Sequence, residues 1–288
     1  MSTIQDVIAR RPGRLRLFRL RSLWRAEGRT PLWIELVAIG WLFWLYDVIN
    51  DSAPFRHALA LRNAGAVLKL EHSLHLAPEL TANRWLATHP TLSLIASYYY
   101  FFAHAAVTFG LLAWLWWRRP QLYRRLRTQL VIVNLIAFAI FWLYPLAPPR
   151  MLTSRGYVDV VARSHAVISW HSGVLVHSAD QLAGMPSLHV AWATWSGLAL
   201  WRLRPRRVVA ALAITYPLLT AAVVIATGNH YLLDVLAGAT VALTALALQT
   251  GSSRAWRHAR HHSRLQGAAV RQPLLASAPT SNGDRSVP

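Results

Sequence analysis

Two short polar motifs, each beside a long apolar run, hold the side chains in this sequence that are best suited to chemistry. The first is GMPSLH at residues 184–189, and the second is GNHYLLD at residues 228–234. Ionisable groups are costly at the ends of membrane helices, so His189, His230 and Asp234 require a functional reason. Because such groups can attack, protonate and orient, we favour chemistry on a phosphate group.

The second motif has the spacing of an activated histidine. His230 and Asp234 are four residues apart, so the spacing predicts that they share one face of a helix, which Asn229 can cap. A carboxylate that accepts from one imidazole nitrogen fixes the tautomer and leaves the other nitrogen as a nucleophile. We therefore expect His230 to attack, with Asp234 hydrogen-bonded behind it.

The first motif is typical of a helix start. Pro186 suits the first helical position, and Gly184 permits an unusual backbone turn before it. This places Ser187 and His189 in the first turn of the helix. A helix start offers free N–H groups and the positive end of the helix dipole, which together favour a phosphate.

A third segment, YPLAPPRM at residues 144–151, ends an apolar run with prolines and presents Arg150. A guanidinium suits bidentate contact with a phosphate and stays charged. A phosphate held by Arg150 and the helix start could then be attacked in line by His230, while His189 protonates the departing oxygen.

The elements that must position these residues are membrane helices. Of 288 residues, 55% are hydrophobic and only 14% are charged, a composition unlike that of a soluble domain. Roughly 20 helical residues span a bilayer core, and the runs lack the alternation of barrel strands, so we expect six transmembrane helices. The runs cover residues 32–50, 92–117, 129–147, 186–201, 208–227 and 231–250, the fourth being the shortest.

The basic residues are concentrated in alternate connections between these runs. Of the 30 Lys and Arg residues, eight lie in residues 1–30, five in 118–127, four in 202–207 and six after residue 250. The positive-inside rule therefore predicts that both termini are cytoplasmic and that the three motifs face the extracytoplasmic side of the inner (plasma) membrane. Nucleic-acid binding explains the net charge of +19 less well, because the arginines are divided among short loops.

We expect three regions along the chain: a basic cytoplasmic arm over residues 1–30, a catalytic membrane domain over 31–250, and a basic, disordered cytoplasmic tail over 251–288. The connection 51–91 contains stretches typical of short helices lying on the bilayer. The connection 148–185 has the length of a lid or a binding loop.

Several alternatives remain open at this point. The absence of cysteine excludes disulfides and thiol nucleophiles, but His189, His230 and Asp234 could bind zinc. Tyr98, Tyr99, Tyr100 and His104 form a separate polar group that we expect to pack or to line the cavity. A small transporter or an anion- or lipid-binding protein without enzymatic activity is the competing class.

At these positions the chain resembles the type 2 phosphatidic acid phosphatase superfamily, since GMPSLH and GNHYLLD look like its second and third motifs. With APPR before them, they most resemble the inositol phosphotransferase branch, which is related to inositol phosphorylceramide synthases. The resemblance covers about residues 90–250. It implies an all-α, six-helix membrane core and a phosphohistidine mechanism without a metal or other cofactor. It further implies that His230 is the nucleophile, that Asp234 orients it and that His189 is the general acid. By the same resemblance, Arg150 and Ser187 are phosphate ligands.

The chain departs from the superfamily at three places. Leu143 stands where the superfamily has a Lys, seven residues before the Arg of the first motif. Val223 and Val224 stand where it has Ser-Arg ahead of the nucleophilic His, and Leu188 replaces the Gly of its Pro-Ser-Gly-His. Two cationic phosphate ligands are therefore missing, which argues against a pyrophosphate substrate.

The resulting hypothesis is a phosphatase or phosphotransferase acting on a phospholipid or a polyprenyl phosphate among the membrane lipids. Arg155, Arg163 or a loop histidine could replace the missing cations. If water resolves the phosphohistidine the enzyme is a phosphatase, and if an alcohol does it is a transferase. A haloperoxidase is disfavoured by the membrane spans, and the oligomeric state stays open.

Overall fold

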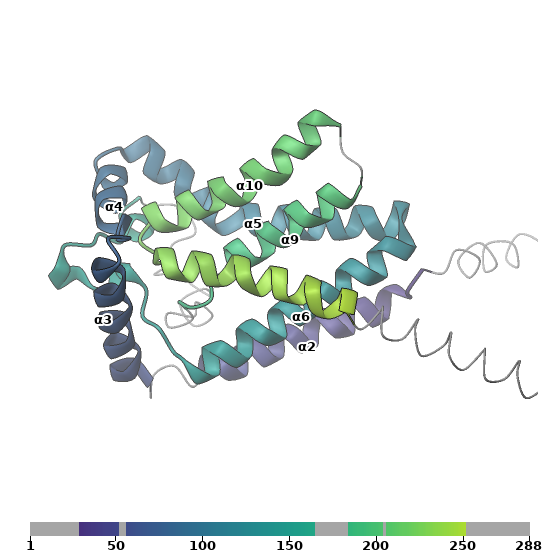
Figure 1. Ribbon diagram of the computed structural model, residues 1–288, viewed down its shortest axis with the longest axis horizontal. Coiled ribbons are helices and arrows are strands. Elements are labelled where there is room, and N and C mark those ends of the chain that lie inside the picture. The colour runs from purple at the N-terminus through teal and green to yellow at the C-terminus, as the bar shows by residue number, and fades with distance from the viewer. Residues whose placement is uncertain (1–28, 52–55, 165–183, 204–205, 252–288) are drawn as a thin grey trace, which may run out of the picture. The chain divides into compact units, whose positions relative to one another are not determined.

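The computed structural model describes residues 29–51, 56–164, 184–203 and 206–251 (Figure 1). Predictions for the N-terminal arm, for nearly all of the tail and for the loop histidines therefore lie outside the described residues. Residues 1–245 form one compact unit and residues 246–288 a second. Every contact discussed below lies within the first unit.

The described elements are helices. The long ones are α2 (Leu32–Asp51), α5 (Pro90–Arg118), α6 (Pro120–Leu143), α9 (Leu188–Arg202), α10 (Arg207–Ala226) and a last helix, Leu232–Gly251. Shorter ones are α3 (His57–Ser73), α4 (Glu79–Ala87), α7 (Val160–Arg163) and the 3-10 turns η2 (Pro149–Met151) and η3 (Thr153–Arg155). The all-helical fold class and the short helices expected in residues 51–91 are confirmed.

Within the described part of the chain, five helices are long and apolar enough to cross a membrane, namely α2, α5, α6, α10 and the last helix. Helix α9 has 15 residues, fewer than the roughly 20 that span a bilayer core. An integral membrane protein is therefore confirmed, and the count of six spans stays a prediction.

Helix α6 begins earlier than the apolar run predicted. Pro120 starts it at the first helical position, where a proline costs no hydrogen bond. The arginines that follow alternate with Tyr123, Leu126 and Leu130, which are buried. One face of this first part of the helix therefore packs in the core. The arginines on the other face keep the segment from being recognised as an apolar run.

Helix α9 packs against α5, α6 and α10, and Figure 1 shows α10 running beside it. The last helix approaches the start of α9 closely, because a Cβ on Gly238 would lie only 2.4 Å from the carbonyl oxygen of Ser187. A side chain there would separate the helices. The two sequence motifs, at the start of α9 and just before the last helix, are therefore brought together.

Helices α3 and α4 pack beside the motif segments. Ala60 and Ala64 of α3 belong to the same buried cluster as Leu146 and Tyr231. In α4, Asn83 donates to the carbonyl oxygens of Val158 and Ala226 at 3.0 and 3.1 Å and accepts from the Val158 N–H at 2.8 Å. This buried amide joins α4 to the connection after α6 and to the end of α10.

Helix α2 is the least buried of the five candidate spans. It packs along α6, where Leu42, Leu45 and Tyr46 contact the buried Phe138 and Phe141. Large apolar side chains on its other faces are exposed, including Trp33 and Trp44. In a bilayer these exposed faces would meet lipid rather than water.

Candidate active site

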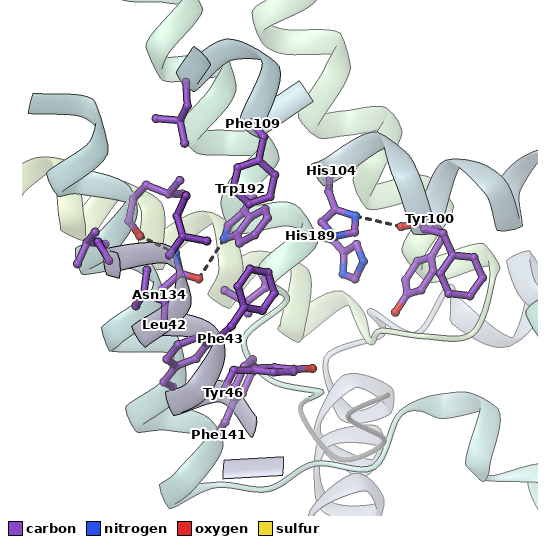
Figure 2. A pocket seen from close by; sticks show the side chains of 18 of the residues that line it. Leu42, Phe43, Tyr46, Tyr100, His104, Phe109, Asn134, Phe141, His189 and Trp192 are labelled. Atoms are coloured by element: carbon purple, nitrogen blue, oxygen red, sulfur yellow. Dashed lines mark hydrogen bonds between the residues drawn. The ribbon is translucent and has the colours of Figure 1, made fainter. Parts of the chain in front are cut away.

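A cavity of about 370 Å³ is lined by α2, α5, α6 and α9 and by the two motif segments (Figure 2). Three of the predicted site residues line it together, Arg150, His189 and His230. The other two, Ser187 and Asp234, are fully buried and are not among the lining residues. The structure therefore places three predicted residues at the cavity wall and two behind it.

The His230 ring is held by a backbone carbonyl. Its Nδ1 lies 2.9 Å from the carbonyl oxygen of Gly184. Since a carbonyl oxygen can only accept, Nδ1 is the donor in this contact, and in the neutral ring the lone pair then lies on Nε2. That tautomer is the one a nucleophilic histidine needs.

Asp234 makes a different contact from the one that the spacing predicted. Its Oδ2 lies 3.6 Å from His230 Nδ1, which is beyond hydrogen-bond distance, and instead accepts from the Tyr231 N–H at 3.0 Å. The helix begins at Leu232, so His230 precedes it and Asn229 is not its cap. Asp234 therefore caps the helix start and lies behind His230 as a nearby negative charge.

Gly184 is required for a reason other than the predicted turn. It is not among the glycines with positive φ. Its N–H donates to the Leu146 carbonyl at 3.1 Å, and an added Cβ would lie 2.7 Å from that same oxygen. The close approach to the segment after α6 thus requires a glycine and fixes the carbonyl that holds His230.

The start of α9 differs by one or two positions from the prediction. Ser187 is the N-cap, and its Oγ accepts from the Val190 N–H at 3.4 Å. Pro186 precedes the cap instead of occupying the first helical position. His189 is the second residue of the helix, so it still lies in the first turn as expected.

The His189 ring is enclosed by aromatic rings of α5, as Figure 2 shows. It stacks on Tyr100 with ring centroids 4.3 Å apart and meets His104 edge-on at the same distance. Its centroid lies 5.7 Å from that of His230. Both Tyr100 and His104 line the cavity, which confirms their expected place.

Arg150 is buried and is oriented by two groups. Its Nη1 donates to Asn229 Oδ1, and its Nε lies 3.6 Å from Asp159 Oδ2. Its backbone N–H donates to the Gly228 carbonyl at 2.8 Å. The guanidinium is thereby fixed beside His230, with its orientation set before any ligand arrives.

The other cations suggested by the sequence lie elsewhere. Arg155 and Arg163 are exposed and do not line the cavity. Of the positions where the superfamily has a cation, Leu143 is 76% exposed and Val224 is packed in the core with Tyr100 and Val190. In the described residues, Arg150 is therefore the arginine placed next to the histidines.

Two buried carboxyl groups that the sequence did not single out hold the start of the last helix. Glu79 Oε1 accepts from the Leu232 N–H and Glu71 Oε1 from the Leu233 N–H, both at 2.8 Å. Free N–H groups at a helix start favour carboxylates. Little in the sequence indicated this role, because acidic residues in the short helices between two apolar runs are expected to be solvent-exposed.

Burial raises the pKa of Glu71 to about 8; the hydrogen bond from the Leu233 N–H opposes this, and the nearby charges of Glu79 and Asp234 add smaller increases. Burial also raises the pKa of Glu79. The second oxygens of both groups lack a donor within the described residues. A proton on Glu71, which the raised pKa favours, would supply a donor to Glu79. No three His, Cys, Asp or Glu side chains of the described part converge on a point that could hold a metal ion.

A family model described as the PAP2 superfamily matches residues 65–248. Among solved structures, the crystal structure of Aquifex aeolicus LpxE is similar, with a TM-score of 0.46 and 18% sequence identity over 61% of this chain and 96% of that chain. No curated protein matched this chain.

Proposed function

The chain belongs to the PAP2 superfamily, and we propose that it is a membrane phosphatase or phosphotransferase that acts on a lipid-linked phosphate through a phosphohistidine. The observation that carries this proposal is the meeting of Arg150, His189 and His230 at one cavity wall, with Nδ1 of His230 bound to the Gly184 carbonyl oxygen. The substrate class is a phospholipid or a polyprenyl phosphate.

In the proposed reaction, Nε2 of His230 attacks phosphorus, so that an N–P bond forms as the bond from phosphorus to the lipid oxygen breaks. His189 gives a proton to the departing oxygen. Arg150 neutralises the charge on the phosphoryl oxygens. Ser187, whose Oγ accepts from the Val190 N–H, would assist as a second ligand by donating its O–H to a phosphoryl oxygen.

In the second half of the reaction a hydroxyl compound resolves the phosphohistidine. His189, now neutral, takes the proton from that hydroxyl as its oxygen attacks phosphorus and the N–P bond breaks. Water gives free phosphate, whereas an alcohol gives a new phosphate ester. Asp234 supports both steps by stabilising the positive charge on the His230 ring.

The number of cations bears on the choice between these outcomes. Arg150 stands alone beside the histidines among the described arginines, which suits a singly charged phosphodiester better than a phosphate monoester or a pyrophosphate. Phosphodiesters are the donors that a phosphotransferase would use. This favours transfer to an alcohol, the outcome expected of the inositol phosphotransferase branch, as the second candidate function.

We further propose that the site faces the extracytoplasmic side of the inner (plasma) membrane and that both termini are cytoplasmic. The distribution of arginines among the connections supports this orientation. Reaction at that face would place the phosphate and any alcohol acceptor outside the cell membrane. Accessibility of single cysteines introduced at Arg155 and at Arg119 to a membrane-impermeant thiol reagent tests it, because only the former should react in intact cells.

The experiment that tests the function uses the purified protein with phosphatidic acid and phosphatidylinositol, each with and without an alcohol acceptor. His230→Ala should abolish turnover, while His57→Ala, at an exposed histidine outside the cavity, should leave it unchanged. A radiolabelled phosphoryl group should be trapped as an acid-labile adduct on His230. An anion-binding protein without catalysis would form no adduct, and an active His230→Ala enzyme would sink the mechanism.

A further inference from the structure

The cavity extends beyond the candidate active site along one stripe of α2. The residues of α2 that line it follow helical spacing, with intervals of three, one, three, one and three residues: Glu35, Ala38, Ile39, Leu42, Phe43 and Tyr46. Such spacing defines a single helix face. We call the part of the cavity between this stripe and α6 the α2 chamber.

The walls of the α2 chamber are mostly apolar and aromatic. Figure 2 shows Phe43, Tyr46 and Phe141 gathered together, apart from His104 and His189. The main polar group between the two ends is Asn134, and it is occupied, since its Oδ1 accepts from Trp192 Nε1 at 3.3 Å and its Nδ2 donates to Leu130 at 2.7 Å. An apolar ligand beside Asn134 therefore leaves both ends of its amide partnered.

An ion pair forms the end of the α2 chamber that lies away from the histidines. Arg127 Nη1 lies 2.7 Å from Glu35 Oε1, and the buried Tyr123 lies near the same carboxylate. All three line the cavity. A methylene group pushed against this pair would displace polar contacts without replacing them, which is costly in an apolar setting.

The length of the chamber matches a lipid chain. At about 1.5 Å per residue, the stripe from Glu35 to Tyr46 covers roughly 16 Å of the α2 axis. The hydrocarbon core of a bilayer is about 30 Å thick, so one leaflet, and hence one chain, measures about half of that. The volume, about 370 Å³ for the whole cavity, falls within the roughly 300–1,000 Å³ of small-ligand pockets.

The chamber also has a wall through which a chain could enter from lipid. Phe43 lines the cavity and is nevertheless 56% exposed. Helix α2 packs chiefly on α6 and is the least buried candidate span. A displacement of α2 would therefore open the chamber sideways at little cost in buried contacts.

We propose that the α2 chamber holds one hydrocarbon chain of the lipid substrate and that the Glu35–Arg127 pair limits the length of that chain. The inference rests on the proposed function, because it places the phosphate of the same lipid at Arg150 and His230. A chain that comes from lipid gains little by entering another apolar space. The chamber therefore selects by shape and length and contributes little to affinity.

The test compares two substrates and two matched variants. The substrates are phosphatidic acids with short (about six-carbon) and long (about sixteen-carbon) chains in detergent micelles, or the phosphatidylinositols of the same lengths if these are turned over faster. Ala38→Phe fills the far half of the chamber. Gly40→Phe, two residues along α2, is the control, because Gly40 is exposed and an added Cβ meets nothing within 4 Å.

We expect Ala38→Phe to lower kcat/KM about tenfold or more for the long-chain substrate, the usual effect of a steric misfit in a pocket, and to leave the short-chain substrate within about twofold. Gly40→Phe should change neither. Equal losses on both substrates, or an unchanged rate on the long one, overturn the chamber as a chain site while the proposed function stands. Failure of the unsubstituted protein on both phospholipid substrates and on a polyprenyl phosphate overturns the proposed function itself.

A second variant removes the Glu35–Arg127 pair at the end of the α2 chamber without leaving an unpaired charge. In the double substitution Glu35→Leu with Arg127→Met, both partners become apolar, which buried ion pairs generally tolerate. The expected result is a shift of the preferred chain length upward by several carbons, measured as the ratio of kcat/KM for chains of about twenty and about sixteen carbons. An unchanged ratio contradicts the length limit and would leave only the apolar wall to determine specificity.

Discussion

The cavity has an arginine near each end, and the two arginines are held differently. At the far end Arg127 meets the carboxylate of Glu35 at 2.7 Å. At the end with the histidines, Arg150 donates to the neutral amide of Asn229, while the carboxylate of Asp159 stays 3.6 Å from its Nε. A carboxylate at 2.7 Å cancels more of the field of its guanidinium than a carboxylate at 3.6 Å does.

Both arginines line the same cavity and both are ion-paired, so residue type alone does not distinguish them. They differ in the length of the ion pair and in the side chains beside them. Arg150, which has the longer pair, lines the cavity with His189 and His230. The phosphate is therefore proposed at Arg150, and the end of the lipid chain at the Glu35–Arg127 pair.

The largest effect should come from removing each arginine in turn. Arg150→Gln is expected to lower kcat/KM about 100- to 1,000-fold, the usual loss when one preorganised donor to a transition state is removed. Arg127→Gln should leave the short-chain substrate within about threefold but lower the Tm in detergent, because it leaves the buried Glu35 without its partner. Similar losses of kcat/KM in both variants would show that the two ends are not distinct.

A smaller effect should follow from Asp234→Asn, which sharpens the description of the histidine end. If the Gly184 carbonyl fixes the His230 tautomer, as the 2.9 Å contact indicates, the amide should keep the Tyr231 contact and cost only about tenfold in kcat through lost charge. If instead the carboxylate is the orienting group, the loss should approach the ~10⁴-fold seen when the aspartate of a serine-protease triad becomes asparagine.

The matched test of the carbonyl itself is Gly184→Ala. The added Cβ would lie 2.7 Å from the Leu146 carbonyl oxygen, so the segment must shift and carry the Gly184 carbonyl away from His230. Misplacement of a catalytic group by about 1 Å can cost about 100-fold, so kcat should fall more than in Asp234→Asn. Gly40→Ala, at an exposed position with open space, is the control. An unaffected kcat in Gly184→Ala would argue against the carbonyl as the group that holds the ring.

The sequence predicted much of the fold, because apolar length is a property of the chain alone. The runs at 32–50, 92–117 and 208–227 agree within about two residues with α2, α5 and α10, about the uncertainty of any helix boundary. The start of α6 was missed because arginines on one face lower the mean hydropathy of a helix that buries its other face.

The sequence predicted the parts of the site that side chains form, but it did not predict the contacts that backbone groups make. Arg150, His189 and His230 were identified by type and spacing, and they do line one cavity wall. The contact of the Gly184 carbonyl with His230 could not be predicted from the sequence, since every residue has a backbone carbonyl. Glu71 and Glu79 reach the helix start across more than 150 residues of chain, a pairing that only the tertiary fold specifies.

The smallest expected effect concerns Glu71, a carboxyl group that, unlike Glu35, forms no ion pair with an arginine of the described residues. Glu71 is surrounded by Glu79, Asp234, Tyr157 and Tyr231, and its pKa is raised from 4.5 to about 8. Between those two pH values the unfolded chain has lost a proton that the folded protein keeps. Unfolding therefore releases a proton, and stability falls as pH rises from about 5 to about 8.

Glu71→Gln should remove that dependence, because an amide resembles the protonated carboxyl group and does not titrate. We expect the Tm of the unsubstituted protein in detergent to fall between about pH 5 and pH 8 by a few degrees more than that of Glu71→Gln, the shift that about 1 kcal/mol produces. Lys69→Gln, at an exposed position of the same helix, should follow the unsubstituted protein. Parallel curves for Glu71→Gln and the unsubstituted protein would mean that Glu71 is ionised throughout. The start of the last helix would then be held by two carboxylates side by side, and the proton between them would have to be abandoned.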